Sequence, residues 1–393
     1  MRKVLITANS ASMIKLFNEL NISILRAMGY EIHVACNFNS SNTISPEAVA
    51  QVMAEWKAQG IVVHQVDYLR SPFAWKSFRI YKQVNDLIRT EQFDLIHCHT
   101  PIVAAFIRLS AAKVRRQGKT KLIYTAHGFH FYKGCPLVNW LIYYPLEKLL
   151  ARLTDVLITI NTEDYTRAIT HIPCPCIEHV NGIGIDTQLI ESVSFDRLAL
   201  CKSLNISENS KIIISAGELN SNKNHSVVIR ALEKLKFSDL HYLIAGIGTD
   251  QERLAQLADT CGCRDRVHFL GYRKDMISLL KCSDIFLFPS FREGLSVVLM
   301  EAMAAGVPVV ASRIRGNVDL IEDCVNGFLC DPQNADEFAN KIQQLLDNPR
   351  LAEEFRYQSL EKIKKYDKSI VLEQLEKIYC EVNEDEKVHL NKV

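Results

Sequence analysis

The sequence predicts an α/β protein built from two tandem domains, each with a parallel, doubly wound sheet. The chain has 393 residues, a length typical of two ordinary domains. Short apolar runs bounded by turn residues alternate with helix-length segments, which is the pattern of strands buried on both faces of a parallel sheet. Because this alternation occurs twice along the chain, two sheets of similar plan are expected.

Apolar runs in each half are interpreted as strands. In the first half they are residues 4–7, 31–36, 61–66, 95–98, 121–125 and 156–160. In the second half they are residues 211–216, 241–245, 267–270, 285–289 and 308–311. Ligands of such sheets bind beyond the carboxyl ends of the strands, so the loops after the strands and the cleft between the domains are the expected functional regions.

Glycines mark the expected seam between the domains at Asn181-Gly182-Ile183-Gly184-Ile185-Asp186. We therefore assign residues 1–185 to the first domain and residues 186–366 to the second. Residues 367–393 are assigned to a final helix, over 369–382, and a charged tail that is expected to fray.

The composition excludes several classes of protein. Hydrophobic residues make up 48% and charged residues 23%, which excludes a disordered chain. The net charge of +1 excludes a strongly basic protein that coats nucleic acid. The 12 cysteines lack the paired spacing of a zinc site and favour free thiols in a reducing cytoplasm. No apolar run reaches the roughly 18 residues that cross a bilayer, and the first one is too short for a signal peptide. The expected location is the cytoplasm.

Basic residues are concentrated in the first half of the chain. Residues 1–185 hold 20 Lys and Arg against 13 Asp and Glu, a net +7, and the remaining residues hold 26 against 32, a net −6. Residues 95–146 contain no acidic residue, but their basic residues include Arg108, Arg115 and Arg116. Such a run is either a solvated helix end or a surface for an anionic membrane or ligand.

Common nucleotide-binding motifs are missing. The loop after the first expected strand contains no glycine, which makes a nicotinamide dehydrogenase an unsuitable interpretation. A phosphate-binding G-x-x-x-x-G-K-[ST] loop is absent, and so is a D-x-D pair that would hold a metal under a diphosphate. Cationic side chains and helix N-termini would therefore have to neutralise a bound diphosphate.

The first candidate anion site follows the expected strand at residues 211–216. Gly217 permits a close backbone turn, and Lys223 in the same loop is able to reach a phosphate. A glycine and a lysine in such a loop are also common for structural reasons alone.

The second candidate anion site is the start of an apolar helix expected at residues 295–305. Its first amides would present a positive helix end to an anion. Glu293 precedes this helix and Glu301 lies two turns into it, so about 12 Å separates the carboxylates at a rise of 1.5 Å per residue. Glycosidase pairs lie roughly 5 to 9.5 Å apart, so the spacing fits hydrolysis poorly and a long nucleotide sugar better. The alternative is a capped helix with two solvated glutamates.

In the first domain, His127 follows the expected strand at residues 121–125 and precedes Gly128. A histidine in a loop next to glycine fits a functional role and a structural one equally well. His97 and His99 lie at the end of another strand, where one of them is expected to point into the core and no metal is expected.

These segments together resemble the retaining glycosyltransferases of family 4, which have the GT-B fold of two facing Rossmann-like domains with a C-terminal helix crossing back to the first. Two motifs of that family are matched by Gly217, Leu219, Lys223 and Asn224 (G-x-L-x-x-x-K-[GN]) and by Glu293 and Glu301 (E-x7-E). Residues 124–131 and 140–145 further resemble bacterial members that build capsular or exopolysaccharide units on a polyprenyl-diphosphate carrier.

The resemblance implies transfer of a hexose or N-acetylhexosamine from a UDP-sugar to a lipid-linked saccharide, without cofactor or metal, on the inner face of the plasma membrane. It implies that Lys223 binds the diphosphate, Glu301 the ribose and Glu293 the sugar. The implied donor-binding residues are Gly217, Lys223, Tyr272, Arg273, Leu295, Ser296, Val297 and Glu301. The implied catalytic residues are His127 and Glu293. The implied acceptor or membrane side holds Ser10, Ser12, Arg108, Arg115 and Arg116.

Two departures from the family pattern leave other functions open. Glu218 stands where many members carry arginine, so Arg273, Arg292 or Arg315 would have to supply the missing charge. Ser10-Ala11-Ser12 replaces a glycine-rich first loop. The alternatives are a UDP-sugar epimerase on the same fold and a nucleotide-sugar-binding regulator without turnover.

Overall fold

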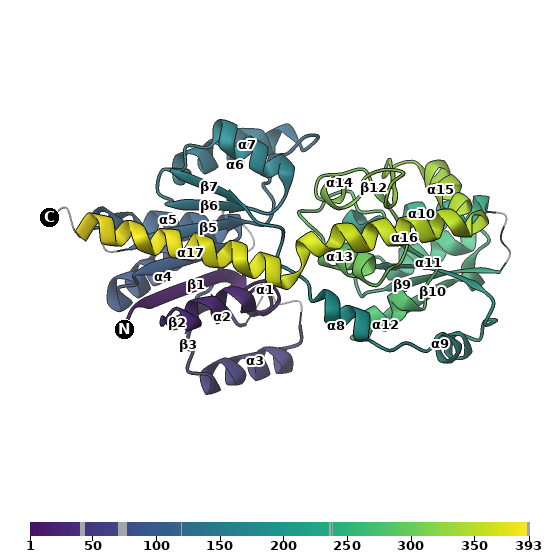
Figure 1. Cartoon of the computed structure of the whole chain (residues 1–393), viewed down its shortest axis with the longest axis horizontal. Helices are drawn as coiled ribbons and strands as arrows, with labels where there is room; N and C mark the ends of the chain where they lie inside the picture. Colours follow the sequence, from purple (N-terminus) through teal and green to yellow (C-terminus); the bar gives the residue numbers. More distant parts are fainter. Residues whose placement is uncertain (40–43, 70–76, 119, 236, 238, 391–393) are drawn as a thin grey trace. The chain divides into compact units, whose positions relative to one another are not determined.

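The computed structural model describes residues 1–39, 44–69, 77–118, 120–235, 237 and 239–390 (Figure 1). The chain divides into two compact units. The first is formed by Met1–Ile183 and Ser369–Val393, and the second by Gly184–Lys368. Each unit contains one parallel sheet with helices on its faces, which confirms the predicted fold class.

The sheet of the first unit has seven strands in the order β3-β2-β1-β4-β5-β6-β7. The strands are β1 (Lys3–Ser10), β2 (Glu31–Asn37), β3 (Val62–Gln65), β4 (Leu95–His99), β5 (Lys121–Ala126), β6 (Val156–Thr159) and β7 (Cys176–His179). The helices between them are α1 (Ala11–Phe17), α2 (Glu19–Ala27), α3 (Pro46–Ala58), α4 (Ser77–Glu91), α5 (Pro101–Arg116), α6 (Leu137–Ala151) and α7 (Thr162–His171). The strand order reverses between β1 and β4, the position at which such sheets bind ligands.

Both faces of this sheet are buried, which explains why its strands are continuous apolar runs. Val4 and Ile6 of β1 pack into one hydrophobic cluster, and Leu5 between them packs into another on the opposite face. Helix α17 (Lys368–Leu390) contributes Leu375 and Tyr379 to the first of these clusters. In Figure 1 this helix, drawn in yellow, lies along the strands of the first unit.

The sheet of the second unit has six strands in the order β10-β9-β8-β11-β12-β13. The strands are β8 (Lys211–Ala216), β9 (Leu240–Ala245), β10 (Val267–Gly271), β11 (Ile285–Phe288), β12 (Val309–Ser312) and β13 (Phe328–Cys330). The helices are α8 (Thr187–Ser192), α9 (Arg197–Leu204), α10 (His225–Lys234), α11 (Gln251–Thr260), α12 (Met276–Lys281), α13 (Val297–Ala304), α14 (Asn317–Leu320), α15 (Ala335–Asp347) and α16 (Pro349–Ile363). The order reverses between β8 and β11, so the loops after these two strands lie at the ligand-binding position.

Two helix bounds differ from the prediction. Helix α13 begins at Val297, because the hydroxyl of Ser296 accepts a hydrogen bond from the amide of Leu299 and makes Ser296 the N-cap. Helix α17 continues to Leu390, where a frayed tail was expected. None of the described helices is long and apolar enough to cross a membrane.

Candidate active site

The loop after β8 holds Lys223 in a defined position. Asn220 caps a short 3₁₀ turn over Ser221–Lys223 by accepting a hydrogen bond from the amide of Lys223 at 3.1 Å. The next residue, Asn224, adopts the left-handed conformation (φ 52°) and donates to the carbonyls of Pro289 and Pro332. These contacts attach the loop after β8 to the loops after β11 and β13, and they hold the backbone next to Lys223 in place.

The ammonium group of Lys223 forms an ion pair with Glu293. Its Nζ lies 2.8 Å from Glu293 Oε1, and the two side chains are only 21% and 15% exposed. The same Nζ lies 5.1 Å from the ring centroid of Phe288, over the ring. The structure therefore brings together the predicted diphosphate-binding and sugar-binding residues, which are 70 positions apart in the chain.

Glycines allow the neighbouring loops to approach one another more closely than other residues would. A Cβ on Gly246 would lie 1.9 Å from the carbonyl oxygen of Gly217, and one on Gly316 would lie 1.9 Å from the carbonyl oxygen of Gly294. A Cβ on Gly217 would lie 3.0 Å from the side chain of Lys223. The loops after β8, β9, β11 and β12 thus lie close together around Lys223 and Glu293.

The start of α13 provides backbone donors beside this pair. The predicted anion-binding amides at Leu295 and Ser296 precede the helix, since Ser296 is its N-cap, so this part of the prediction needs correction. Val297 and Val298 are the first two helical residues, and no described residue accepts a hydrogen bond from their amides. These two amides carry the positive end of the helix dipole.

Glu301 lies one turn further along α13. Burial raises the pKa of its carboxyl group to about 7, and no described residue forms a hydrogen bond or ion pair with this carboxylate. The raised pKa is the expected result for an acidic group that is desolvated without a compensating donor. A ligand with hydroxyl groups would supply that donor.

The structure distinguishes among the arginines that were expected to replace the missing cation at Glu218. Arg273 is engaged by both carboxylate oxygens of Asp275, at 2.8 and 2.6 Å. Arg315 is buried and donates to the carbonyl oxygen of Glu293. Arg292 is exposed and has no ion pair with any described residue. Arg292 is therefore the arginine of the three that is available to an incoming anion. Tyr272, another of the implied donor-binding residues, is 64% exposed.

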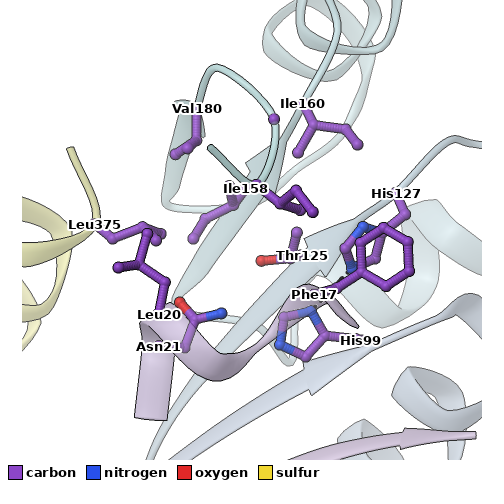
Figure 2. A pocket seen from close by; sticks show the side chains of 12 residues that line it. Phe17, Leu20, Asn21, His99, Thr125, His127, Ile158, Ile160, Val180 and Leu375 are labelled. Carbon is purple, nitrogen blue, oxygen red and sulfur yellow. Dashed lines mark hydrogen bonds between the residues drawn. The ribbon is translucent and has the colours of Figure 1, made fainter. Parts of the chain in front are cut away.

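In the first unit, His127 directly follows β5 and lines a small cavity (Figure 2). Its Nε2 lies 3.1 Å from Nδ1 of His99, and the ring of Phe17 packs edge-on at 5.4 Å between centroids. Burial lowers the pKa of His127 to about 4, so its imidazole is neutral at pH 7. The cavity of about 20 Å³ has room for roughly one water molecule.

His97 and His99 both point into the interior, so the expectation that only one of them does is wrong. They are two positions apart on β4, and residues at that spacing share a face of the sheet.

His97 forms a hydrogen bond at each ring nitrogen. Its Nδ1 lies 2.7 Å from the hydroxyl of Tyr379 on α17, and its Nε2 lies 2.8 Å from the hydroxyl of Thr125. The Tyr379 hydroxyl donates to Oδ1 of Asn21. The Tyr379 hydroxyl therefore accepts from Nδ1–H of His97, and His97 Nε2 accepts from Thr125. Nε2 of His99 has no hydrogen-bond partner among the described residues.

Ser10 and Ser12, which were assigned to the acceptor side, lie in the interior. Both are about 1% exposed, and their hydroxyl oxygens are 3.1 Å apart. Ser10 also accepts from the amide of Met13 as the N-cap of α1. We reassign both hydroxyls to the start of α1, because this burial leaves them no exposed surface for an acceptor.

The basic run on α5 is not a continuous cationic surface. Arg108 is 1% exposed and forms a bidentate ion pair with Glu147 of α6, with N–O distances of 2.5 and 3.1 Å. Arg115 is engaged by Asp155 at 2.6 Å, and Arg116 is exposed. The expected membrane-side role is therefore corrected for Arg108, whose charge is neutralised inside the protein.

One group of potential metal ligands is present among the described residues. Ligand atoms of His33, His64 and Glu91 lie within 4.8 Å of one another. Lys3 forms an ion pair with Glu91 at 2.8 Å, and the two histidines are hydrogen-bonded to each other at 2.9 Å. Lys3 and His33 lie near the amino ends of their strands, so the group is at the opposite end of the sheet from the loop that holds His127.

In each unit, some residues around the predicted ones could not be recognised from the sequence motifs. His99 approaches His127, and Asn21 and Tyr379 complete the network behind it, although 358 positions separate these two residues. The apolar spacing of α17 would have indicated only that Tyr379 faces a core. Arg292 stands next to the predicted Glu293, and its exposure became clear only in the structure.

Comparison with known families gives a match in each half of the chain. The model described as Glycosyltransferase Family 4 matches residues 23–189. The model described as Glycosyl transferases group 1 matches residues 196–362.

Individual relatives and solved structures cover from two thirds to nearly all of the chain. A Bacillus subtilis (strain 168) protein named as a glycosyltransferase, EpsD, is 34% identical over 382 residues, which is 96% of either chain. An Escherichia coli UDP-Gal:α-D-GlcNAc-diphosphoundecaprenol α-1,3-galactosyltransferase is 28% identical over 270 residues, which cover 67% of this chain and 68% of that protein. The crystal structure of Anabaena HepE with UDP has a TM-score of 0.78 at 19% identity, over 97% of this chain and 100% of HepE, and so shares the fold.

Proposed function

This chain belongs to the family 4 glycosyltransferases of GT-B fold, and from that premise we propose that it transfers a hexose or N-acetylhexosamine from a UDP-sugar to a saccharide on a polyprenyl-diphosphate carrier, in surface polysaccharide biosynthesis. Family membership establishes the transferase activity. The observation that carries the choice of a nucleoside-diphosphate donor is the Lys223–Glu293 pair beside the amides of Val297 and Val298, which have no acceptor among the described residues. The name of the E. coli relative supports both the UDP-sugar and the lipid-linked acceptor.

The proposed donor site neutralises the diphosphate with protein groups and without a metal. The ammonium group of Lys223 and the amides of Val297 and Val298 stabilise the charge that develops on the leaving phosphate. Arg292 is the additional exposed cation. Glu293 exchanges its ion pair with Lys223 for hydroxyl groups of the sugar, and Glu301 accepts hydrogen bonds from the ribose hydroxyls.

We assign the transfer to a route on one face of the sugar, which retains the anomeric configuration. The bond between the anomeric carbon and the leaving phosphate oxygen breaks, and a bond from that carbon to the acceptor oxygen forms. The acceptor proton passes to the leaving phosphate, so no enzyme nucleophile is required. We also assign a role in the transfer to His127 of the first unit, as a hydrogen-bonding group that burial keeps neutral and that contacts His99.

The donor class is tested by calorimetric titration of the whole protein with UDP, GDP and NAD. The site offers a cation and two amides to a diphosphate and a carboxylate to a ribose, groups that all three ligands contain. We expect UDP to bind in preference to the other two because the E. coli relative is named for a UDP-sugar donor. Preferential binding of GDP would replace the proposed donor with a GDP-sugar. Binding of none of the three would contradict the donor site.

UDP affinity is expected to depend on the ionisation of Glu301. Its pKa is raised to about 7, so the carboxylate that accepts ribose hydroxyls is mostly present at pH 8 and mostly absent at pH 6. If the ionised carboxylate of Glu301 is the form that binds the ribose, this pKa predicts a UDP affinity about tenfold weaker at pH 6 than at pH 8. The phosphates of UDP also titrate in this range, so the informative quantity is the difference between the wild-type protein and Glu301→Gln. Equal pH dependence in both proteins would contradict the role of Glu301.

A further inference from the structure

Helix α6 presents an apolar face to the outside of the first unit. Its buried residues are restricted to Glu147, Leu150 and Ala151. Large apolar side chains are exposed in two adjacent rows along the helix, at spacings of four or eight residues. They are Leu137, Val138, Leu141, Ile142, Leu146 and Leu149, with Leu137 80% and Leu141 76% exposed. A contiguous apolar surface of this kind marks an interaction site in a folded protein.

A crevice of about 210 Å³ lies between α6 and α5. Apolar residues from both helices and from the loop after β5 form most of its lining, including Ile102, Phe106, Leu109, Phe131, Leu146 and Leu150. Leu109 and Leu146 are also exposed, so the crevice opens among outward-facing apolar side chains. An apolar protein cavity of ~150 Å³ is large enough for a benzene ring, so this crevice has room for several carbon atoms of a hydrocarbon chain.

The charged groups of the crevice are already paired with each other. Arg108 and Glu147 are its cationic and acidic lining residues, and they form the bidentate ion pair described above. The guanidinium carbon of Arg108 also lies 4.5 Å from the ring centroid of Tyr124, over the ring. Among its described lining residues the crevice therefore has no unpaired charge that would require a charged ligand, and this lining favours an apolar one.

Cationic side chains accompany the apolar surface. Those on α5, on α6 and directly beside α6 are exposed at Lys113, Arg116, Lys133, Lys148 and Arg152. No acidic residue occurs between residues 95 and 146. An apolar helix face with basic residues beside it is complementary to a lipid interface, where phosphates lie next to hydrocarbon. An apolar protein partner would not require this excess of one charge.

We propose that the crevice between α5 and α6 binds the prenyl chain of the lipid-linked acceptor while the apolar face of α6 lies in the membrane interface. This inference rests on the proposed function for the identity of the lipid. The basic side chains pair with the phosphates of the lipid and of its neighbours. The enzyme thereby withdraws part of one chain from the bilayer and holds its acceptor by the lipid as well as by the saccharide.

The crevice is tested with geranylgeranyl phosphate, titrated below its micelle concentration into the full-length protein. Ala105 of α5 lines the crevice, so Ala105→Trp fills it and is expected to weaken binding at least about tenfold, since a buried apolar contact is lost. Ala112 lies two turns further along the same helix, has the same intermediate exposure and is not part of the lining, so Ala112→Trp is the matched control. Equal affinity of both variants, or equal binding of hexadecyl phosphate by the wild-type protein, would overturn the assignment to a prenyl chain.

The apolar face of α6 is tested by sedimentation with vesicles of phosphatidylglycerol and phosphatidylcholine. Leu141→Ser/Leu149→Ser is expected to lower vesicle binding about tenfold, because two exposed leucines no longer enter the interface. Leu16→Ser/Ile169→Ser removes two comparably exposed side chains of the first unit and should leave binding unchanged. Unchanged binding of the α6 variant, or a wild-type dimer that this variant dissociates, would show that the surface does not contact lipid.

Neither test contains a nucleotide sugar. Loss of prenyl binding with normal UDP binding would therefore overturn this inference and leave the donor assignment intact. Normal prenyl binding without UDP binding would do the reverse.

Discussion

Replacing Lys223 by alanine is expected to lower transfer from a UDP-sugar by about 100- to 1,000-fold, the loss typical of a single preorganised charge-stabilising donor. Lys223 is the one cationic side chain of the loop after β8, and the loop is held by Asn220 and Asn224 in the position from which the ammonium group reaches Glu293. The rate is measured as UDP release in the presence of acceptor. UDP affinity is expected to fall in the same variant.

Lys234→Ala is the matched control for this experiment. Lys234 lies at the end of α10, is exposed and is paired with Asp336 at the surface, so its removal should leave UDP release unchanged. Turnover by Lys223→Ala at the wild-type rate would contradict the donor site. Conversion of the donor to its isomer without release of UDP would indicate epimerisation, the alternative that the sequence left open.

Removing one partner of the Arg108–Glu147 pair is expected to destabilise the protein by about 3–5 kcal/mol, because the remaining charge is left buried without a counter-ion. Both side chains are almost completely buried, and Arg108 also donates to the carbonyl of Ala104. The change is measured as the free energy of unfolding in urea for Arg108→Ala and for Glu147→Ala. The double variant Arg108→Met/Glu147→Leu should recover most of the loss, because apolar groups then replace both charges.

Arg115→Ala provides the comparison for a pair nearer the surface. Arg115 and Asp155 are 14% and 26% exposed, so we expect a loss of about 1 kcal/mol or less. If Arg108→Ala lost no more stability than Arg115→Ala, burial of the first pair would not carry the energy assigned to it. If the double variant Arg108→Met/Glu147→Leu lost as much stability as Arg108→Ala and Glu147→Ala together, Arg108 and Glu147 would not stabilise each other.

Most of the predicted strands have apolar runs that are buried on both faces. The edge strands β3 and β10 are also predicted, although they are less buried. Two further edge strands are missed. Strand β7 reads Cys-Ile-Glu-His and is half-buried, and β13 has only three residues. Such short segments are strands because they form hydrogen bonds with a neighbouring strand. The local sequence pattern does not show which strand that neighbour is.

Side-chain partners across the fold could not be predicted for a similar reason. The sequence motifs indicate Lys223 and Glu293 separately, and the ion pair between them depends on the folding of two loops. Arg108 was counted among surface charges, although it shares a helical face with Ala104, Ile107 and Ala111, all of which are buried. That spacing indicated burial of Arg108, but only the packing of α6 on α5 supplied Glu147 as its counter-ion.

The contribution of α17 to the first unit has a consequence for the order in which the protein becomes native on the ribosome. The second unit is one continuous stretch, Gly184–Lys368, and its core requires no later residue. The first unit, by contrast, draws Leu375 and Tyr379 into a core whose other members are translated much earlier. Domains generally fold as units during synthesis, but here the N-terminal unit is completed only after the second has emerged. Until then its buried His97 lacks the hydroxyl partner that Tyr379 supplies, and the part of the core that α17 covers stays uncovered.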